Sequence, residues 1–253
     1  EPLVHKGILS FIASLKEKGL TDLSITTNGI LLEKMAKDLK QAGIDRVNIS
    51  LDSINPERFS WITRGGDVNA VLRGVEAALR EGLDPVKLNM VVVKGLNDTE
   101  AVELSEMAKD KPLHIRFIEL MPVGKEGTWS KANFVSSADT MEKIEAAGYK
   151  LKPSTVRGAG PAEIYKVDGW CGTLGFIHAI SGHFCASCNR LRLTADGKLY
   201  PCLHSSCSLD IMAPLRQGAS DAELLDIIKE AVNLKPEHST LGAQNHCMNT
   251  IGG

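Results

Sequence analysis

The sequence has almost no net charge and no long apolar run, and each absence excludes a class of protein. Its 29 lysines and arginines nearly balance 31 aspartates and glutamates, which gives a formal net charge of −2. Proteins that bind duplex nucleic acid usually carry a strong basic excess, so we expect no nucleic-acid partner. No apolar run approaches the roughly 18 residues of a membrane-spanning helix, so we expect no membrane partner. With 253 residues and 43% apolar content, the chain is long and apolar enough to bury a core.

Residues 1–125 alternate between the helical and the strand period. Apolar residues recur at helical spacing over 8–18, 32–42, 68–81 and 98–109, and strands are predicted at 22–26, 46–52, 86–93 and 113–119. Strands that alternate with helices through short loops form parallel sheets with right-handed crossovers. The sequence therefore predicts an α/β fold that is either part of a barrel or an open parallel sheet.

The pattern changes after residue 125. We expect a connector and one helix over 126–150, and short strands with two helices, at about 208–217 and 221–233, over 151–253. Asp196 and Gly197 predict a hairpin with a two-residue turn. In that register Leu191 lies opposite Cys202.

Polar residues interrupt strands that should be apolar if both faces of the sheet are covered. Lys87 shares one strand face with Asn89, and His114 shares one with Arg116. A buried lysine or arginine needs a partner, which is either an anionic ligand or an acidic side chain. Glu119 and Asp52 are the acidic candidates, so both interpretations stay open here.

Further polar residues follow the strands at their carboxyl ends. They are Thr26, Thr27, Asn28, Ser50, Asp52 and Ser53. Barrels and open α/β sheets hold their ligands at this end. The sequence therefore predicts a binding site there.

Four of the six cysteines lie between residues 183 and 207. Cys185 and Cys188 form a C-x-x-C pair, and the predicted hairpin brings Cys202 back beside them. Clustered cysteines are more typical of a metal site in a reducing cytoplasm than of a disulfide framework. Three cysteines fit an iron–sulfur cluster, whereas a structural zinc needs a fourth ligand, from Cys207, His204 or His183. Both metals remain open on spacing alone.

Two arginines lie inside this cysteine-rich stretch. Arg190 and Arg192 are two residues apart and therefore share one face of the predicted strand. Paired guanidinium groups suit phosphate oxygens, although a solvated hairpin face would carry arginines too. In the predicted register Cys202 lies on the opposite face, with Leu191.

The chain resembles a known family in the segments "TTNG", "VNISLDS", "VKLNMVVVKGLND", "RFIELMPVG", "FCASCNRLRLTADGKLYPCL" and the terminal "IGG". These are similar to the radical S-adenosylmethionine GTP 3′,8-cyclases (MoaA family) of molybdenum cofactor biosynthesis. The resemblance implies a partial (β/α)6 barrel that lacks its first strands, followed by a smaller α+β iron–sulfur region. It also implies a lyase that converts GTP to 3′,8-cyclo-7,8-dihydro-GTP.

The resemblance also implies roles for individual residues. An auxiliary [4Fe–4S] cluster would be bound by Cys185, Cys188 and Cys202. GTP would contact Thr26, Lys87, Arg116, Arg190, Leu191 and Arg192. S-adenosylmethionine would contact Ser50 and Met121, and the tail with Gly252 and Gly253 would reach toward the active site.

One expected motif is absent, because the sequence contains no C-x-x-x-C-x-x-C loop. In the family this loop binds a second [4Fe–4S] cluster that acts on S-adenosylmethionine. We therefore interpret the chain as N-terminally truncated and expect it to be inactive alone. The family's partners would be an electron donor such as flavodoxin or ferredoxin and a downstream cyclic pyranopterin monophosphate synthase, and a homodimer stays open. Two alternatives remain: a non-catalytic zinc or iron–sulfur module that binds a nucleotide, and another radical enzyme with an auxiliary cluster.

Overall fold

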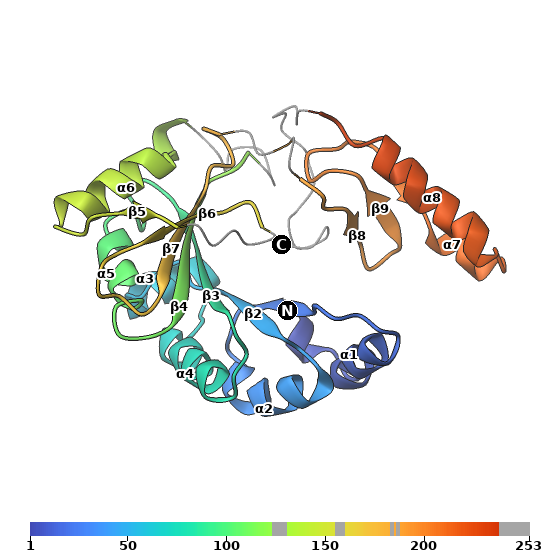
Figure 1. Cartoon of the computed structure of the whole chain (residues 1–253), viewed down its shortest axis with the longest axis horizontal. Coiled ribbons are helices and arrows are strands. Elements are labelled where there is room, and N and C mark those ends of the chain that lie inside the picture. The colour runs from blue at the N-terminus through green and yellow to red at the C-terminus, as the bar shows by residue number, and fades with distance from the viewer. Residues whose placement is uncertain (123–130, 155–159, 183–184, 186–187, 238–253) are drawn as a thin grey trace. The chain divides into compact units, whose positions relative to one another are not determined.

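The structure is a computed structural model that describes residues 1–122, 131–154, 160–182, 185 and 188–237. The chain forms two compact units. Unit 1 comprises Glu1–Glu119 and Phe134–His178, and unit 2 comprises Leu120–Asn133 and Ala179–Gly253. Figure 1 labels most of the helices and strands of both units.

Unit 1 is built on one mixed sheet with the strand order β1-β2-β3-β4-β7-β6-β5. The parallel strands are β1 (Ser24–Thr27), β2 (Arg46–Ser50), β3 (Val86–Val92), β4 (Leu113–Glu119) and β7 (Thr173–Ile177). The antiparallel strands β6 (Glu163–Lys166) and β5 (Lys152–Pro153) extend the sheet beyond β7. The expected α/β class with a parallel sheet is confirmed. Strands β5 to β7 belong to this sheet, whereas the sequence placed residues 151–178 in the C-terminal region.

Helices alternate with the parallel strands along the chain, and two of them precede β1. They are η1 (Pro2–Val4), α1 (Ile8–Glu17), α2 (Leu32–Ala42), α3 (Pro56–Thr63), α4 (Val68–Arg80), α5 (Ala101–Glu106) and α6 (Ser137–Ala146). Helix α3 was not predicted from the sequence. Helix α5 begins later than predicted, because Asn97 and Asp98 accept backbone N–H groups of Val93 and Gly95 in a turn before it.

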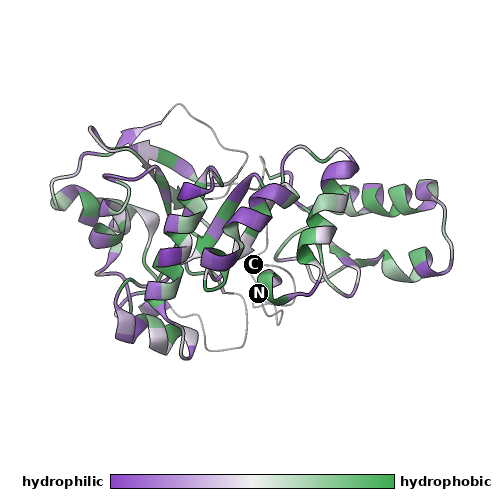
Figure 2. Ribbon diagram, turned by 90° about the horizontal axis from the view of Figure 1, so that it is seen from below, coloured by the Kyte–Doolittle hydropathy of each residue, from purple (hydrophilic) through white to green (hydrophobic). Residues whose placement is uncertain are grey.

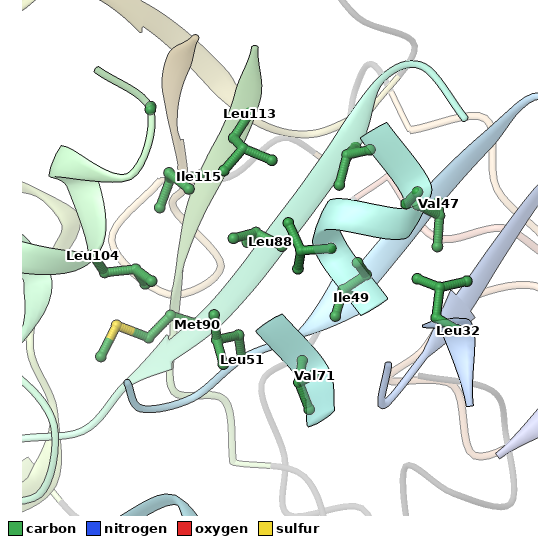
Figure 3. Packing of buried hydrophobic residues seen from close by; sticks show 14 of the residues in the cluster. Leu32, Val47, Ile49, Leu51, Val71, Leu88, Met90, Leu104, Leu113 and Ile115 are labelled. Carbon is green, nitrogen blue, oxygen red and sulfur yellow. The ribbon is translucent and has the colours of Figure 1, made fainter. Parts of the chain in front are cut away.

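The core of unit 1 lies between the helices and one face of the sheet. Figure 3 shows apolar side chains of β2, β3 and β4 meeting those of α2, α4 and α5. Strand β3 buries Val86, Leu88, Met90 and Val92 toward this core and leaves the residues between them half-buried. Helix α4 packs closely against the turn before α2, since a Cβ on Gly74 would lie 2.6 Å from the carbonyl oxygen of Gly29. The sheet face opposite the helices is the one that carries the polar side chains.

Unit 2 contains a three-stranded antiparallel sheet in the order β10-β9-β8. Its strands are β8 (Arg192–Leu193), β9 (Lys198–Tyr200) and β10 (Leu209–Asp210), and its helices are η2 (Lys131–Asn133), α7 (Met212–Arg216) and α8 (Asp221–Asn233). Apolar and polar residues mix along α7 and α8 (Figure 2), and Leu225, Ile228 and Val232 of α8 are exposed. No helix in the described part of the chain is long and apolar enough to cross a membrane.

The predicted register of the hairpin in unit 2 is wrong by one residue. Arg192 lies opposite Tyr200 and Leu193 opposite Leu199, so the loop has three residues, 195–197, rather than two. Thr194 N–H donates to the carbonyl of Lys198, which closes this loop. Gly197 has a φ of 79°, and a three-residue hairpin loop needs such a left-handed residue at its last position.

Candidate functional site

A chain of hydrogen bonds crosses the polar face of the sheet in unit 1. The guanidinium of Arg116 on β4 donates to Oδ1 of Asn89 on β3 and to Oδ1 of Asn48 on β2, each at 2.7 Å. The amide of Asn48 in turn donates to the hydroxyl of Thr26 on β1 at 3.4 Å. The sheet register brings these residues together, because Thr26 lies opposite Asn48 and Asn89 lies opposite Arg116. Two of the predicted site residues, Thr26 and Arg116, are thus parts of one network.

Within the described residues, Lys87 and Arg116 have no acidic partner, whereas Arg46 on the same face pairs with Asp22. In the described part of the chain no ion pair or hydrogen bond joins Lys87 to a carboxylate, and the hydrogen bonds of Arg116 go to neutral amides. Glu119 lies on the opposite face and accepts the Ser137 N–H at 2.8 Å, and Asp52 accepts the Val91 N–H at 2.8 Å. The acidic candidates that the sequence offered for Arg116 and Lys87 are therefore engaged elsewhere.

Burial and mutual repulsion weaken the charged forms of these side chains. Burial, together with the charges of Arg116 and Arg46, lowers the pKa of Lys87 from 10.5 to about 8. Burial and the charge of Arg46 lower the pKa of Arg116 to about 10. An anion bound at this face would relieve both effects by supplying the missing opposite charge. The face is therefore suited to a negatively charged ligand.

Three residues of this face were missed by the sequence analysis. Asn48 alternates with buried Val47 and Ile49, a pattern that could have placed it on the polar face. Thr173 on β7 shares a 2.7 Å hydrogen bond with Nδ1 of His114, and no local signal links the two residues. Gly175 leaves room for Arg116, because a Cβ at this position would lie 3.2 Å from Cγ of Arg116.

The carboxyl end of the sheet is held by side chains from neighbouring loops. Glu1 accepts the hydroxyl of Thr27 at 2.8 Å and the backbone N–H of Asn28 at 2.6 Å, so it binds the end of β1. Ser50 ends β2 and lies opposite Asn89 in the register. It is exposed, as a residue that contacts a ligand can be.

Side chains of the loop after β3 bind the loop after β2. Glu100 is buried and accepts the hydroxyl of Ser53 at 2.8 Å and the N–H of Ile54 at 2.7 Å, and it pairs with Arg58. The amide of Asn97 donates to the carbonyl of Asp52 at 2.7 Å. These contacts position the chain that follows Ser50.

In unit 2 the arginines lie close to two of the cysteines. The observed ladder ends at the pair Arg192–Tyr200, so Arg190 and Cys202 lie just beyond it and the predicted pairing of Leu191 with Cys202 is not part of it. Burial and the charge of Arg190 lower the pKa of Arg192, while the thiolates of Cys202 and Cys188 act to raise it. The predicted residues Arg190, Arg192 and Cys202 are therefore near one another.

The C-x-x-C pair forms a tight turn. The N–H of Cys188 donates to the carbonyl of Cys185 at 3.1 Å. Burial alone would raise the pKa of Cys188, but hydrogen bonds and charge from Arg190, with the charge of Lys235, lower it. A lowered pKa favours the thiolate, which is the form that binds metals. The chemistry of these donors therefore fits an iron–sulfur cluster or zinc.

The structure does not assemble a complete ligand set. Among the residues it describes, no three cysteine, histidine, aspartate or glutamate side chains are close enough to hold a metal ion. His204 is buried beside Arg192, and its Nδ1 has no hydrogen-bond partner within the described ranges. Cys207 is exposed, while His183 lies outside the described residues. The set Cys185, Cys188 and Cys202 thus stays a prediction.

The remaining predicted residues are divided between the units. Leu191 and Met121 lie in unit 2 and are half-buried, whereas Ser50 lies in unit 1. Gly252 and Gly253 lie outside the described residues. Each set of predicted contacts is therefore placed only within its own unit.

Known proteins resemble the chain over its whole length. The Radical SAM superfamily matches residues 1–108, and the family described as Molybdenum Cofactor Synthesis C matches residues 113–241. The "GTP 3′,8-cyclase" of Heliobacterium modesticaldum is 48% identical over 260 residues, which span 100% of this chain and 80% of that protein. The "GTP 3′,8-cyclase" of Pelotomaculum thermopropionicum is 44% identical over 258 residues, with 100% and 79% covered.

Among solved structures, a radical SAM methyltransferase from Sphaerobacter thermophilus is 20% identical to this chain. The match covers 53% of this chain and 39% of the methyltransferase chain. Its TM-score of 0.39 is too low to carry an argument. The sequence relatives are decisive, because they combine high identity with nearly full coverage. The chain belongs to the GTP 3′,8-cyclase family of radical SAM proteins of molybdenum cofactor synthesis.

Proposed function

We propose that this chain binds GTP and serves in its conversion to 3′,8-cyclo-7,8-dihydro-GTP, the first step of molybdenum cofactor biosynthesis. The observation that carries the proposal is the uncompensated charge of Lys87 and Arg116 on the polar face of unit 1. A triphosphate would neutralise these groups where water is partly excluded, so their attraction to it is stronger than at an open surface. Thr26, at the end of the same network, would contact the ligand as well.

The architecture of the family supports a finer assignment. Strands β1 to β4 would be the last strands of a partial (β/α)6 barrel, and the part of the chain from Ala179 onward, rather than from residue 151, would form the auxiliary-cluster and GTP-binding region. The two family descriptions also separate an N-terminal radical SAM part, matched over 1–108, from a C-terminal part, matched over 113–241, with the boundary near residue 110. Ser50 and Met121 would contact S-adenosylmethionine.

In unit 2, Cys185, Cys188 and Cys202 would bind the auxiliary [4Fe–4S] cluster. A cluster held by three cysteines has one iron without a protein ligand, and that iron would take an atom of the guanine. The chain's own contribution is orientation: Arg190 and Arg192 lie near Cys188 and Cys202, so they would hold the nucleotide beside the cysteines. Their charges also favour an anionic ligand.

A second [4Fe–4S] cluster and S-adenosylmethionine would supply the radical chemistry. The electron donor would be a flavodoxin or ferredoxin, and a cyclic pyranopterin monophosphate synthase would use the product. None of the described residues is assigned a step in radical formation. They bind and orient GTP.

The test is the metal content of the chain purified without oxygen. We expect about four irons per chain with matching sulfide. Replacing Cys185, Cys188 and Cys202 by serine should abolish both, whereas serine at the exposed Cys171 and Cys207 should change neither. About one zinc without sulfide would instead favour the nucleotide-binding zinc module, with His204 as a candidate fourth ligand.

GTP binding is tested on the same protein by equilibrium dialysis. We expect GTP to bind much more tightly than guanosine, because the triphosphate meets Lys87 and Arg116. Equal affinity for GTP and guanosine would show that Lys87 and Arg116 do not bind the triphosphate, and it would contradict the proposal.

A further inference from the structure

Lys235 joins the two strands of the β8–β9 hairpin just beyond the end of their ladder. Its ammonium donates to the carbonyl of Arg190, before β8, at 2.8 Å and to the carbonyl of Pro201, after β9, at 3.1 Å. The last pair of the ladder is Arg192 with Tyr200. Beyond this pair, the lysine side chain holds together two segments that are no longer paired as strands.

The two carbonyls belong to the segments that carry the predicted site. Arg190 is the first residue of the Arg-Leu-Arg stretch, and Pro201 directly precedes Cys202. One ammonium therefore ties the segment proposed to bind GTP to the segment proposed to bind metal. A shift of either segment would change the spacing between Arg190 and Cys202.

Lys235 is itself well anchored. It is the second residue after α8, and its N–H donates to the carbonyl of Val232 at 3.1 Å. Helix α8 lies against β9 and buries Ala231 completely. In the described part of the chain no ion pair joins Lys235 to a carboxylate, so its charge adds to those of Arg190 and Arg192.

We propose that Lys235 is a positioning residue that sets the spacing of Arg190 and Cys202 for GTP. This inference rests on the proposed function, in which both residues face the nucleotide. The ammonium uses two of its three donors on main-chain carbonyls. It therefore fixes the backbone and makes no hydrogen bond to the side chain of Arg190 or of Cys202.

The test uses the full chain reconstituted with iron and sulfide without oxygen. Lys235→Met keeps the length of the side chain and removes its donors, and Lys235→Arg restores donors and charge. Lys229→Met is the matched control, because Lys229 lies on the exposed face of α8 and pairs with Asp226. The readouts are the GTP dissociation constant and the electron paramagnetic resonance spectrum of the reduced cluster with and without GTP.

We expect Lys235→Met to weaken GTP binding about tenfold, the usual effect of losing hydrogen bonds to a charged donor. It should also diminish the change that GTP causes in the cluster spectrum. Lys235→Arg should bind GTP within about threefold of the original chain, and Lys229→Met should be indistinguishable from it.

A double variant separates positioning from a general loss of structure. If Lys235 acts through the arginine segment, Lys235→Met should have little further effect when Arg190→Ala is already present. Equal losses with and without Arg190→Ala would overturn the proposal. Thermal unfolding of each variant shows whether it is folded at the temperature of the binding measurement.

The possible failures are distinguishable. If the original chain binds neither iron–sulfur nor GTP, the proposed function fails and the role of Lys235 fails with it. If the original chain binds both and Lys235→Met binds GTP as tightly as Lys229→Met, only the role of Lys235 is overturned.

Discussion

Arg116 on β4 donates a 2.7 Å hydrogen bond to Asn48 on β2, across the intervening strand β3. The acceptor is a neutral amide, although aspartate would fill the same space and neutralise the arginine. A structural role would be served better by aspartate, since a buried cation is stabilised by an opposite charge. The amide orients Arg116 and leaves its charge available to a ligand.

Replacing Asn48 by aspartate should therefore have opposite effects on stability and binding. We expect Asn48→Asp to raise the thermal midpoint of unfolding and to weaken GTP binding by on the order of tenfold or more. Calorimetry and equilibrium dialysis measure the two effects. Asn48→Ala is the control, because it removes the hydrogen bond without adding charge. Unchanged GTP affinity in Asn48→Asp would show that Arg116 does not meet the triphosphate.

Lys87 should make GTP binding depend on pH. Its pKa in the folded chain is about 8, so its positive charge is lost as the pH rises through this value. We expect GTP affinity to fall between pH 7 and 9 by more than the ionisation of GTP explains. Lys87→Met should bind GTP more weakly at pH 7 and should lose this part of the pH dependence. A Lys87→Met profile parallel to that of the original chain would contradict the assignment.

The same residue should affect stability without ligand. Between its folded pKa of about 8 and its ordinary value of 10.5, the unfolded chain binds more protons at Lys87 than the folded chain. The contribution of Lys87 to the free energy of unfolding therefore rises with pH over this window. Urea unfolding of the original chain and of Lys87→Met at several pH values measures this contribution.

Glu100 should stabilise unit 1 through the loop after β2. Burial alone would raise its pKa, but hydrogen bonds from Ile54, Arg58 and Ser53 outweigh burial and lower it. Its contribution is therefore present above the ordinary pKa of a glutamate and is lost as the pH falls through the lowered value. We expect Glu100→Gln to reduce the free energy of unfolding by about 1–3 kcal/mol at neutral pH.

Urea unfolding at pH 7 and in acid checks this prediction. Glu103→Gln is a matched control, because Glu103 is exposed on the same helix. The difference between Glu100→Gln and the original chain should shrink in acid. A difference that is the same at both pH values would mean that the charge of Glu100 does not contribute.

Gly197 should hold the hairpin register of unit 2. Its φ is 79°, and a Cβ there would lie 2.3 Å from Cβ of Met212. Gly197→Ala introduces both conformational strain and this close contact. We expect it to lower the free energy of unfolding by about 2 kcal/mol or more. Gly218→Ala is the control, since Gly218 has a φ of 86° but nothing within 4 Å of the added atom. Hydrogen exchange over residues 192–200 should increase in Gly197→Ala beyond the control, and equal exchange in both would contradict the contact.

Several features of the protein followed from the sequence alone because they depend on local periodicity. The alternation of buried and polar residues in β3 and β4 was readable from their composition, since successive side chains in a strand point to opposite faces. This alternation alone indicates that Lys87 and Arg116 lie on the polar face. The C-x-x-C pair and the two arginines are likewise readable from the spacing of residues in the sequence.

Other features depend on contacts between distant parts of the chain, and only the tertiary structure decided them. Strand β7 joins the sheet beside β4, a pairing that no local pattern indicates. The hairpin register, in which Arg192 lies opposite Tyr200, occurs together with the close packing of Gly197 against Met212. Lys235 reaches Arg190 across 45 positions of the chain. Such contacts arise when packing selects one arrangement among several that the local sequence allows, and here that packing placed the arginines beside the cysteine.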